Sequence, residues 1–118
     1  MNIKEKAFEI KEKTIAIRRD IHRHPELGFE EFRTSKLVSE KLIALGLDVQ
    51  TEVAETGVVG LLKGTSDSPV LLLRFDMDAL PIKEETTVPY ASEKPGKMHA
   101  CGHDSHVSVG LSVAEILS

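Results

Sequence analysis

Three histidines, one cysteine and one aspartate lie between His99 and His106. Thiolate, imidazole and carboxylate groups are the ligands that zinc and other transition metals prefer in proteins. Cys101 and His103 are two residues apart, and in an extended loop that spacing lets both side chains reach one ion. Gly102 between them permits a tight backbone. The segment therefore predicts a divalent metal site with Cys101 and His103 as ligands.

Two other interpretations of this segment are open. Histidines can gather near the start of a helix without binding anything, although so dense a mixture of ligand types favours a metal. A lone cysteine can also be a catalytic nucleophile. Nothing in the sequence points to an oxyanion hole or to a third group that would orient a base, which favours the metal site over the nucleophile.

Asp76 and Asp78 directly follow the apolar run Val70–Phe75. In extended backbone, residues two apart point the same way, and ligand sites of α/β proteins gather at the carboxyl ends of interior strands. A ligating histidine usually donates its other ring proton to a carboxylate, so Asp76, Asp78 or Asp104 could support the metal site. The alternatives are a surface turn capped by the two aspartates and, for Asp104, a favourable acid at a helix N-terminus.

Helical periodicity occurs on both sides of these clusters. Apolar residues three and four apart predict an amphipathic helix from Ile3 to about His24, where Pro25 ends it. Residues 30–46 predict a second helix, with Phe32 among the residues of its apolar side and Gly46 as a left-handed cap. Residues 104–117 predict a third helix that is largely buried.

The middle of the chain predicts about three strands. Alternation over Asp48–Glu55 and the run Val58–Lys63 predict two of them. Val70–Phe75 has no alternation, which is typical of an interior strand covered on both faces. Residues 76–103 carry little periodicity and predict a long loop, usually functional or disordered at this length. The fold class predicted is α/β, a sheet covered by helices.

Length, charge and composition limit the classes of protein to which this chain can belong. With 118 residues the chain suffices for one small domain. A net charge of −4 argues against nucleic acid as the main partner, and the basic residues between Arg18 and His24 are interpreted as a solvated helix face. No apolar run predicts a membrane span and no secretory signal is seen. A single cysteine excludes an internal disulfide and fits a cytoplasmic setting.

Four segments carry a family resemblance: RRDIHRHPELGFEE, TGVVG, LRFDMDALPI and GKMHACGHDSH, in this order. Together they resemble the amino-terminal half of the aminoacylase-type metallopeptidases, in the branch of hippurate hydrolase, N-acyl-amino-acid amidohydrolases and indole-acetyl-amino-acid hydrolases. The resemblance runs from about Arg18 to Leu117. It implies a layered α/β/α catalytic domain that binds two divalent ions, with Zn, Mn, Co or Ni all suitable.

The resemblance also implies roles. Cys101 and His103 would be metal ligands, Asp78 would orient a ligand or substrate group, and a metal-bound water would hydrolyse the amide bond of an N-acyl amino acid. The family's paired glutamates, further histidine ligands and lid domain match no residue here. Residues 1–118 are therefore expected to be a partial catalytic domain, inactive alone and prone to self-association or to pairing with the missing part. The alternative is a non-catalytic module that binds a metal or a partner.

Overall fold

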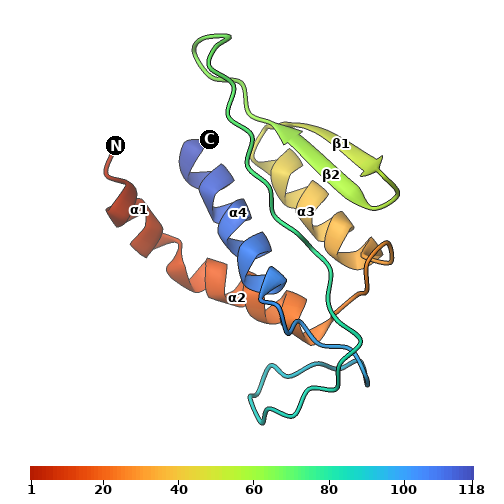
Figure 1. Cartoon of the computed structure of the whole chain (residues 1–118). Coiled ribbons are helices and arrows are strands. Elements are labelled where there is room, and N and C mark those ends of the chain that lie inside the picture. Colours follow the sequence, from red (N-terminus) through yellow and green to blue (C-terminus); the bar gives the residue numbers. More distant parts are fainter.

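The chain folds into four helices and one two-stranded antiparallel sheet. The computed structural model describes residues 1–118, and Figure 1 shows the elements in order: α1 (Ile3–Glu9), α2 (Lys11–Arg23), α3 (Phe32–Ala44), β1 (Asp48–Val53), β2 (Gly57–Leu61) and α4 (His103–Leu117). The predicted α/β class is confirmed. None of the helices has the length and apolar character needed to cross a bilayer.

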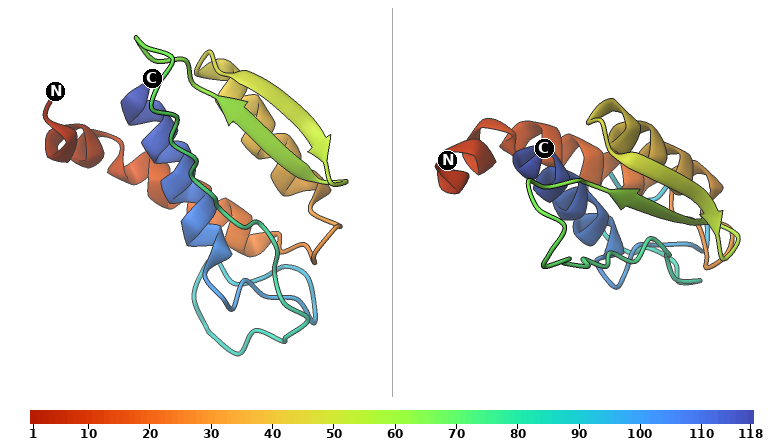
Figure 2. Two further views of the ribbon diagram at one scale, coloured as in Figure 1. Left: turned by 45° about the horizontal axis from the view of Figure 1, so that its top comes forward. Right: turned by 90° about the horizontal axis from the view of Figure 1, so that it is seen from above.

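The predicted N-terminal helix is interrupted at Ile10, which caps α1 and precedes α2. Its C-terminal end was predicted correctly, because α2 stops at Arg23 with His24 as its cap, directly before Pro25. The predicted apolar face is buried only in α2, at Ile17 and Ile21, whereas Ile3 in α1 is exposed. The reason is that α1 diverges from the other helices, as Figure 2 shows, so its first turn has nothing to pack on.

One small hydrophobic core joins α2, α3 and α4. Ile17 and Ile21 of α2 pack with Val107 and Leu111 of α4. Partly buried residues complete the cluster: Leu37, Val38 and Leu42 of α3, and Met77. The prediction that α4 is largely buried holds for the face that carries Val107 and Leu111, whereas Val109 and Leu117 are half exposed.

Glu26 fixes the start of α3. Its carboxylate accepts hydrogen bonds from the backbone N–H of Arg33 (2.8 Å) and of Thr34 (2.7 Å), and from the Thr34 hydroxyl (2.7 Å). These are the N–H groups that a helix leaves without internal partners. At the other end Gly46 takes a left-handed conformation (φ +85°), as predicted. Phe32 is 69% exposed, so its predicted place on the packed side was wrong.

The strand pair β1–β2 lies against α3 (Figure 1). Asp48 pairs with Leu61 and Gln50 with Val59, and the register shifts before Val53 pairs with Gly57. The buried carboxylate of Glu31, just before α3, accepts a hydrogen bond from the hydroxyl of Thr56 in the turn. Two segments that drew attention in the sequence, HPELGFEE and TGVVG, are thus linked by structural contacts.

The predicted interior strand at Val70–Phe75 is not present as a strand. The segment runs as an irregular trace beside α4 (Figures 1 and 2), where a Cβ added to Gly110 would lie 2.7 Å from the Phe75 ring. Val70, Leu71 and Leu72 are about four-fifths exposed. A strand requires a hydrogen-bonded neighbour, and the sheet of this chain consists of β1 and β2 alone. The apolar composition was therefore a poor guide to burial.

Residues 76–102 form the predicted long loop, tied at a few points. The Ala79 N–H donates to the Glu26 carbonyl (2.8 Å), and Leu80 and Met98 exchange two backbone hydrogen bonds of 2.9 and 3.0 Å. The Glu93 N–H donates to the Arg23 carbonyl (2.9 Å). These bonds bring the segment that contains Asp78 next to the one that leads to α4.

Candidate metal centre

Asp78 and His103, 25 positions apart in the chain, are in contact. The Nδ1 of His103 lies 2.9 Å from the Asp78 carboxylate Oδ1 and 2.9 Å from the Asp78 carbonyl oxygen. Both are acceptors, so Nδ1 carries the proton and Nε2 is the nitrogen with a free lone pair. No protein group occupies Nε2. This carboxylate–imidazole pairing is the arrangement that orients metal-ligating histidines.

Cys101 lies just before this pair. Its thiol is free and exposed, and Gly102, in a left-handed conformation (φ +82°), leads directly into α4. An exposed thiol and an imidazole with a free Nε2 are suitable donors for a divalent transition metal. No three His, Cys, Asp or Glu side chains of this chain converge where they could hold an ion. The donors therefore fit part of a metal site, and the ligand roles of Cys101 and His103 stay predictions.

The other predicted candidates have different surroundings. Asp76 pairs with the exposed Arg74 (2.9 Å) and not with the histidines. His106 is exposed, with its ring centre 5.8 Å from that of His103. His99 is buried, and neither of its ring nitrogens has a hydrogen-bond partner. Of the two aspartates considered together in the sequence, the structure brings only Asp78 to the histidine.

A buried network of charged side chains lies behind His103. Asp104, the second residue of α4, is fully buried, and its Oδ2 accepts hydrogen bonds from Arg18 Nε (2.9 Å) and His22 Nδ1 (2.8 Å). The other nitrogen of His22, Nε2, lies 2.9 Å from Glu84 Oε1. The Tyr90 hydroxyl accepts a hydrogen bond from Arg18 (3.2 Å). The network joins α2, α4 and the long loop.

The interpretation of the basic residues as a solvated helix face was wrong for Arg18 and His22. The two are four residues apart and share one side of α2, which turns inward because it meets the carboxylate of Asp104. From the sequence, His22 had no role beyond that solvated face, and Glu84 did not stand out. The only feature of the sequence that pointed to this network was the spacing of four residues between Arg18 and His22. Such a spacing is common in helices and is not specific for a buried charge network.

Burial, hydrogen bonds and neighbouring charges shift the pKa values of His99 and Glu84. Burial lowers the pKa of His99; the charge of Asp104 opposes this and that of His22 adds to it. For Glu84 burial acts to raise the pKa, but hydrogen bonds from Thr86 and the Ser92 N–H, together with His22, leave it below the usual value. His99 is accordingly favoured as a neutral ring and Glu84 as a carboxylate.

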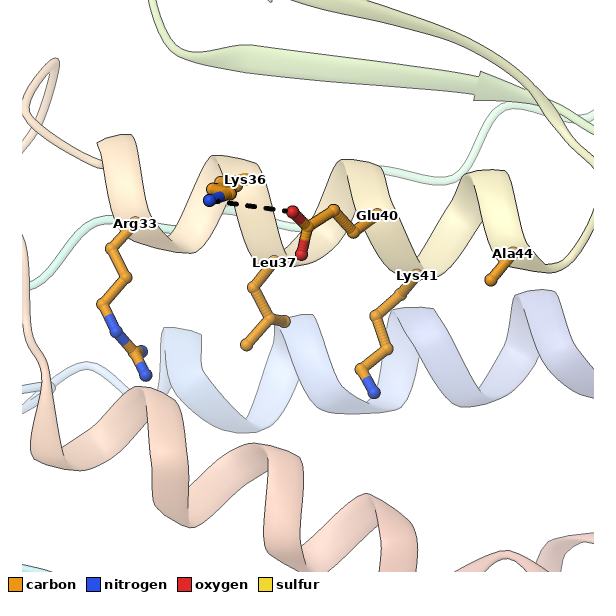
Figure 3. Close-up of a pocket in the computed structure, with 6 residues that line it drawn as sticks. All are labelled: Arg33, Lys36, Leu37, Glu40, Lys41 and Ala44. Carbon is orange, nitrogen blue, oxygen red and sulfur yellow. Dashed lines mark ion pairs between the residues drawn. The ribbon is translucent and has the colours of Figure 1, made fainter.

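A surface hollow on α3 lies away from this chemistry. Figure 3 shows Arg33, Leu37 and Lys41 directed from α3 toward the neighbouring helices, with an ion pair of 3.9 Å between Lys36 and Glu40. Ala44 completes its lining. Asp78, Cys101 and His103 do not line it, so the hollow is separate from the candidate metal centre.

Comparisons with known proteins find similarity to metallopeptidases. The model of peptidase family M20/M25/M40 matches residues 72–118, which contain Asp78, Cys101 and His103. The YXEP protein of Bacillus subtilis, described as a dinuclear metal-binding peptidase of the M20 family, has 42% sequence identity and a TM-score of 0.84 over 89% of this chain and 30% of its own. Over these residues the chain is similar to the M20 peptidase family. The resemblance stated from the sequence is confirmed.

Two relatives whose names describe hydrolases of amino-acid conjugates are similar to this chain over most of its length. Hippurate hydrolase of Campylobacter jejuni is 45% identical over the whole of this chain, and the IAA-amino acid hydrolase ILR1-like 5 of Arabidopsis thaliana is 50% identical over 87% of it. This chain spans 31% and 23% of the length of these two relatives.

The lowered pKa of Glu84 predicts a pH-dependent effect on stability. A carboxyl group with a lower pKa in the folded state stabilises the fold above its unfolded pKa, near 4.5, and that contribution is lost as pH falls through the folded value. Glu84→Gln should lower the free energy of unfolding at pH 7 by about 2 kcal/mol. Urea titrations between pH 7 and pH 3 should show the deficit shrinking with acid. Glu85→Gln, an exposed neighbour, is the control; an equal loss there would refute a special role for Glu84.

Proposed function

We propose that this chain supplies metal-ligating residues to an enzyme that hydrolyses the amide bond of N-acyl amino acids. One observation carries the proposal: the Asp78 carboxylate fixes the His103 ring with Nε2 free, two residues after an exposed thiol. A thiolate and a neutral imidazole are two of the protein ligands found in catalytic metal sites, and a carboxylate commonly orients the imidazole.

Support for the reaction class comes from the relatives. The names of the Campylobacter and Arabidopsis proteins describe cleavage of an acyl group from an amino acid, and the Bacillus protein binds two metal ions. Within residues 72–118 the family match contains all three proposed site residues. Residues 1–118 would then form one part of a catalytic domain, with an N-acyl amino acid as the small-molecule substrate.

The proposed roles follow from the contacts. Cys101 and His103 hold the ion, and Asp78 keeps the His103 ring in the tautomer that can bind it. When bound, a divalent ion polarises a carbonyl group and lowers the pKa of water. Mixed sulfur and nitrogen donors suit Zn²⁺, Mn²⁺, Co²⁺ or Ni²⁺ in principle, and a two-ion site would need ligands beyond the pair present here. Because a thiolate ligand must stay reduced, the proposal includes a reducing, cytoplasmic setting.

Cobalt binding tests the ligand assignment. Titration of the chain with Co²⁺ should produce a thiolate-to-metal absorption band that is lost in Cys101→Ala and His103→Ala. Asp78→Asn should weaken binding about 10- to 100-fold, because the ring loses its orienting carboxylate. Asp76→Asn is the matched control, since Asp76 pairs only with Arg74, and it should bind as the unaltered chain does. An unchanged band in Cys101→Ala would contradict the assignment.

Hydrolysis gives a second test. With two proposed ligands and no third converging group, the 118-residue chain loaded with metal should release no benzoate from hippurate above the buffer rate. Liquid chromatography of the reaction over a day provides the measurement. Turnover that disappears in Cys101→Ala would instead show that these residues already form a complete site.

The exposed apolar run at residues 70–73 leads us to expect self-association of this chain. Unpaired extended segments with apolar side chains pair readily with other strands. Sedimentation velocity should show concentration-dependent association that Leu72→Lys reduces. Thr65→Lys adds the same charge in the adjoining polar turn and should not. A monomer at every concentration would refute pairing through this run.

A further inference from the structure

His22 lies between two carboxylates in the interior of the chain. Its Nδ1 is 2.8 Å from Asp104 and its Nε2 is 2.9 Å from Glu84. The exposed fraction of the side chain is 4% for His22 and Glu84 and 0% for Asp104. Water therefore cannot replace either contact.

Each ring nitrogen of His22 faces an oxygen of a carboxylate. An ionised carboxylate only accepts, and a neutral imidazole has a single N–H. Glu84 already accepts from the Ser92 N–H (2.8 Å) and from the Thr86 hydroxyl, and Asp104 accepts from Arg18. The donors to Glu84 favour its ionised form, whereas both donors to Asp104 converge on Oδ2 and its Oδ1 is buried without a hydrogen-bond partner. With a carboxylate oxygen facing each nitrogen, the contacts of His22 favour a ring that donates from both.

The charges of the network support the same state. Asp104 and Glu84 contribute two negative charges, and Arg18 together with a doubly protonated His22 contributes two positive ones. The edge of the His22 ring meets the Tyr90 ring at 5.5 Å between centres. A neutral His22 would leave one buried negative charge without compensation, which is costly.

We infer that His22 is a positioning residue for the proposed metal ligand His103. As a doubly protonated ring on α2, it holds Asp104 of α4 and Glu84 of the long loop in place. The inference rests on the proposed function. No side-chain hydrogen bond caps the N-terminus of α4, so the first turn depends on other contacts for its position. Asp104 directly follows His103, and fixing its carboxylate fixes the backbone from which the His103 ring projects.

The Glu84 contact acts on the other side of the site. Glu84 accepts from the Ser92 N–H, which holds the part of the long loop that leads back through Met98 to His99. Met98 pairs with Leu80, two residues after Asp78. One imidazole thus restrains both segments that bring Asp78 and His103 together.

Nitrogen NMR of the unaltered chain tests the state of the ring. With ¹⁵N-labelled histidine at pH 7, both ring nitrogens of His22 should show the shifts of protonated imidazolium nitrogens, each coupled to a proton. A His22 ring with one unprotonated nitrogen at pH 7 would overturn the inference, whatever the chain's metal affinity. This measurement needs no variant and so does not depend on whether a variant folds.

A pair of matched variants tests the positioning role. His22→Gln removes one of the two donors, whereas His24→Gln alters the neighbouring, partly exposed histidine that contacts Asp20 and Glu93 outside the network. His22→Gln should weaken Co²⁺ binding about tenfold or more, as loss of an outer hydrogen-bond partner does at metal sites, and should change the Co²⁺ absorption band at saturation. His24→Gln should change neither. Equal affinity and an identical band in His22→Gln would overturn the positioning role, because a purely structural contact would leave the saturated spectrum unaltered.

Amide hydrogen exchange separates this inference from the proposed function. The N–H groups of Ser105 and His106 donate to the Gly102 carbonyl in the first turn of α4, and their exchange should be faster in His22→Gln than in His24→Gln. Failure of the unaltered chain to bind Co²⁺ would contradict the proposed function. Unchanged exchange at these two amides would instead contradict the positioning role of His22.

Discussion

The buried carboxylate of Asp104 is the constraint on which the arrangement of this chain depends. An isolated charge cannot be taken out of water without partners, so Asp104 requires Arg18 and His22 of α2 beside it. That requirement places the N-terminal turn of α4 against α2, and the few apolar contacts of Ile17, Ile21 and Val107 then close around it. Since the hydrophobic core is small, these polar contacts have a large share in setting how the two helices pack.

The candidate metal centre depends on the same contacts. Its residues come from a loop with little regular structure, and a loop alone does not hold ligands accurately. Here the Asp78 segment is fixed by the bond from Ala79 to Glu26 and by the pairing of Leu80 with Met98, while His103 is fixed by the helix that Asp104 anchors. The carboxylate–imidazole contact of Asp78 and His103 is where these two supports meet.

Similarity to the M20 family and the contacts of Asp78 and His103 are separate grounds for the proposed metal chemistry. The family assignment rests on similarity along the chain, whereas the tautomer of His103 follows from two oxygen acceptors at 2.9 Å from Nδ1. The segment HPELGFEE, also part of the original resemblance, has a structural explanation: Glu26 caps α3 and Glu31 holds the turn at Thr56. The segments that resemble the family therefore contain residues that support the fold as well as residues suited to metal binding.

The sequence by itself determined the elements whose causes are local. Pro25 ends α2, Gly46 ends α3, and the alternation after Asp48 gives the strand pair, because steric and hydrogen-bonding preferences act within a few residues. It also predicted Cys101, His103 and Asp78 as site residues, since dense ligand types and the family resemblance are visible without coordinates. Only the tertiary structure decided what depends on distant partners. Val70–Phe75 is not paired because a strand needs a neighbour that periodicity does not supply, and His22 is buried because a carboxylate 82 positions away meets it.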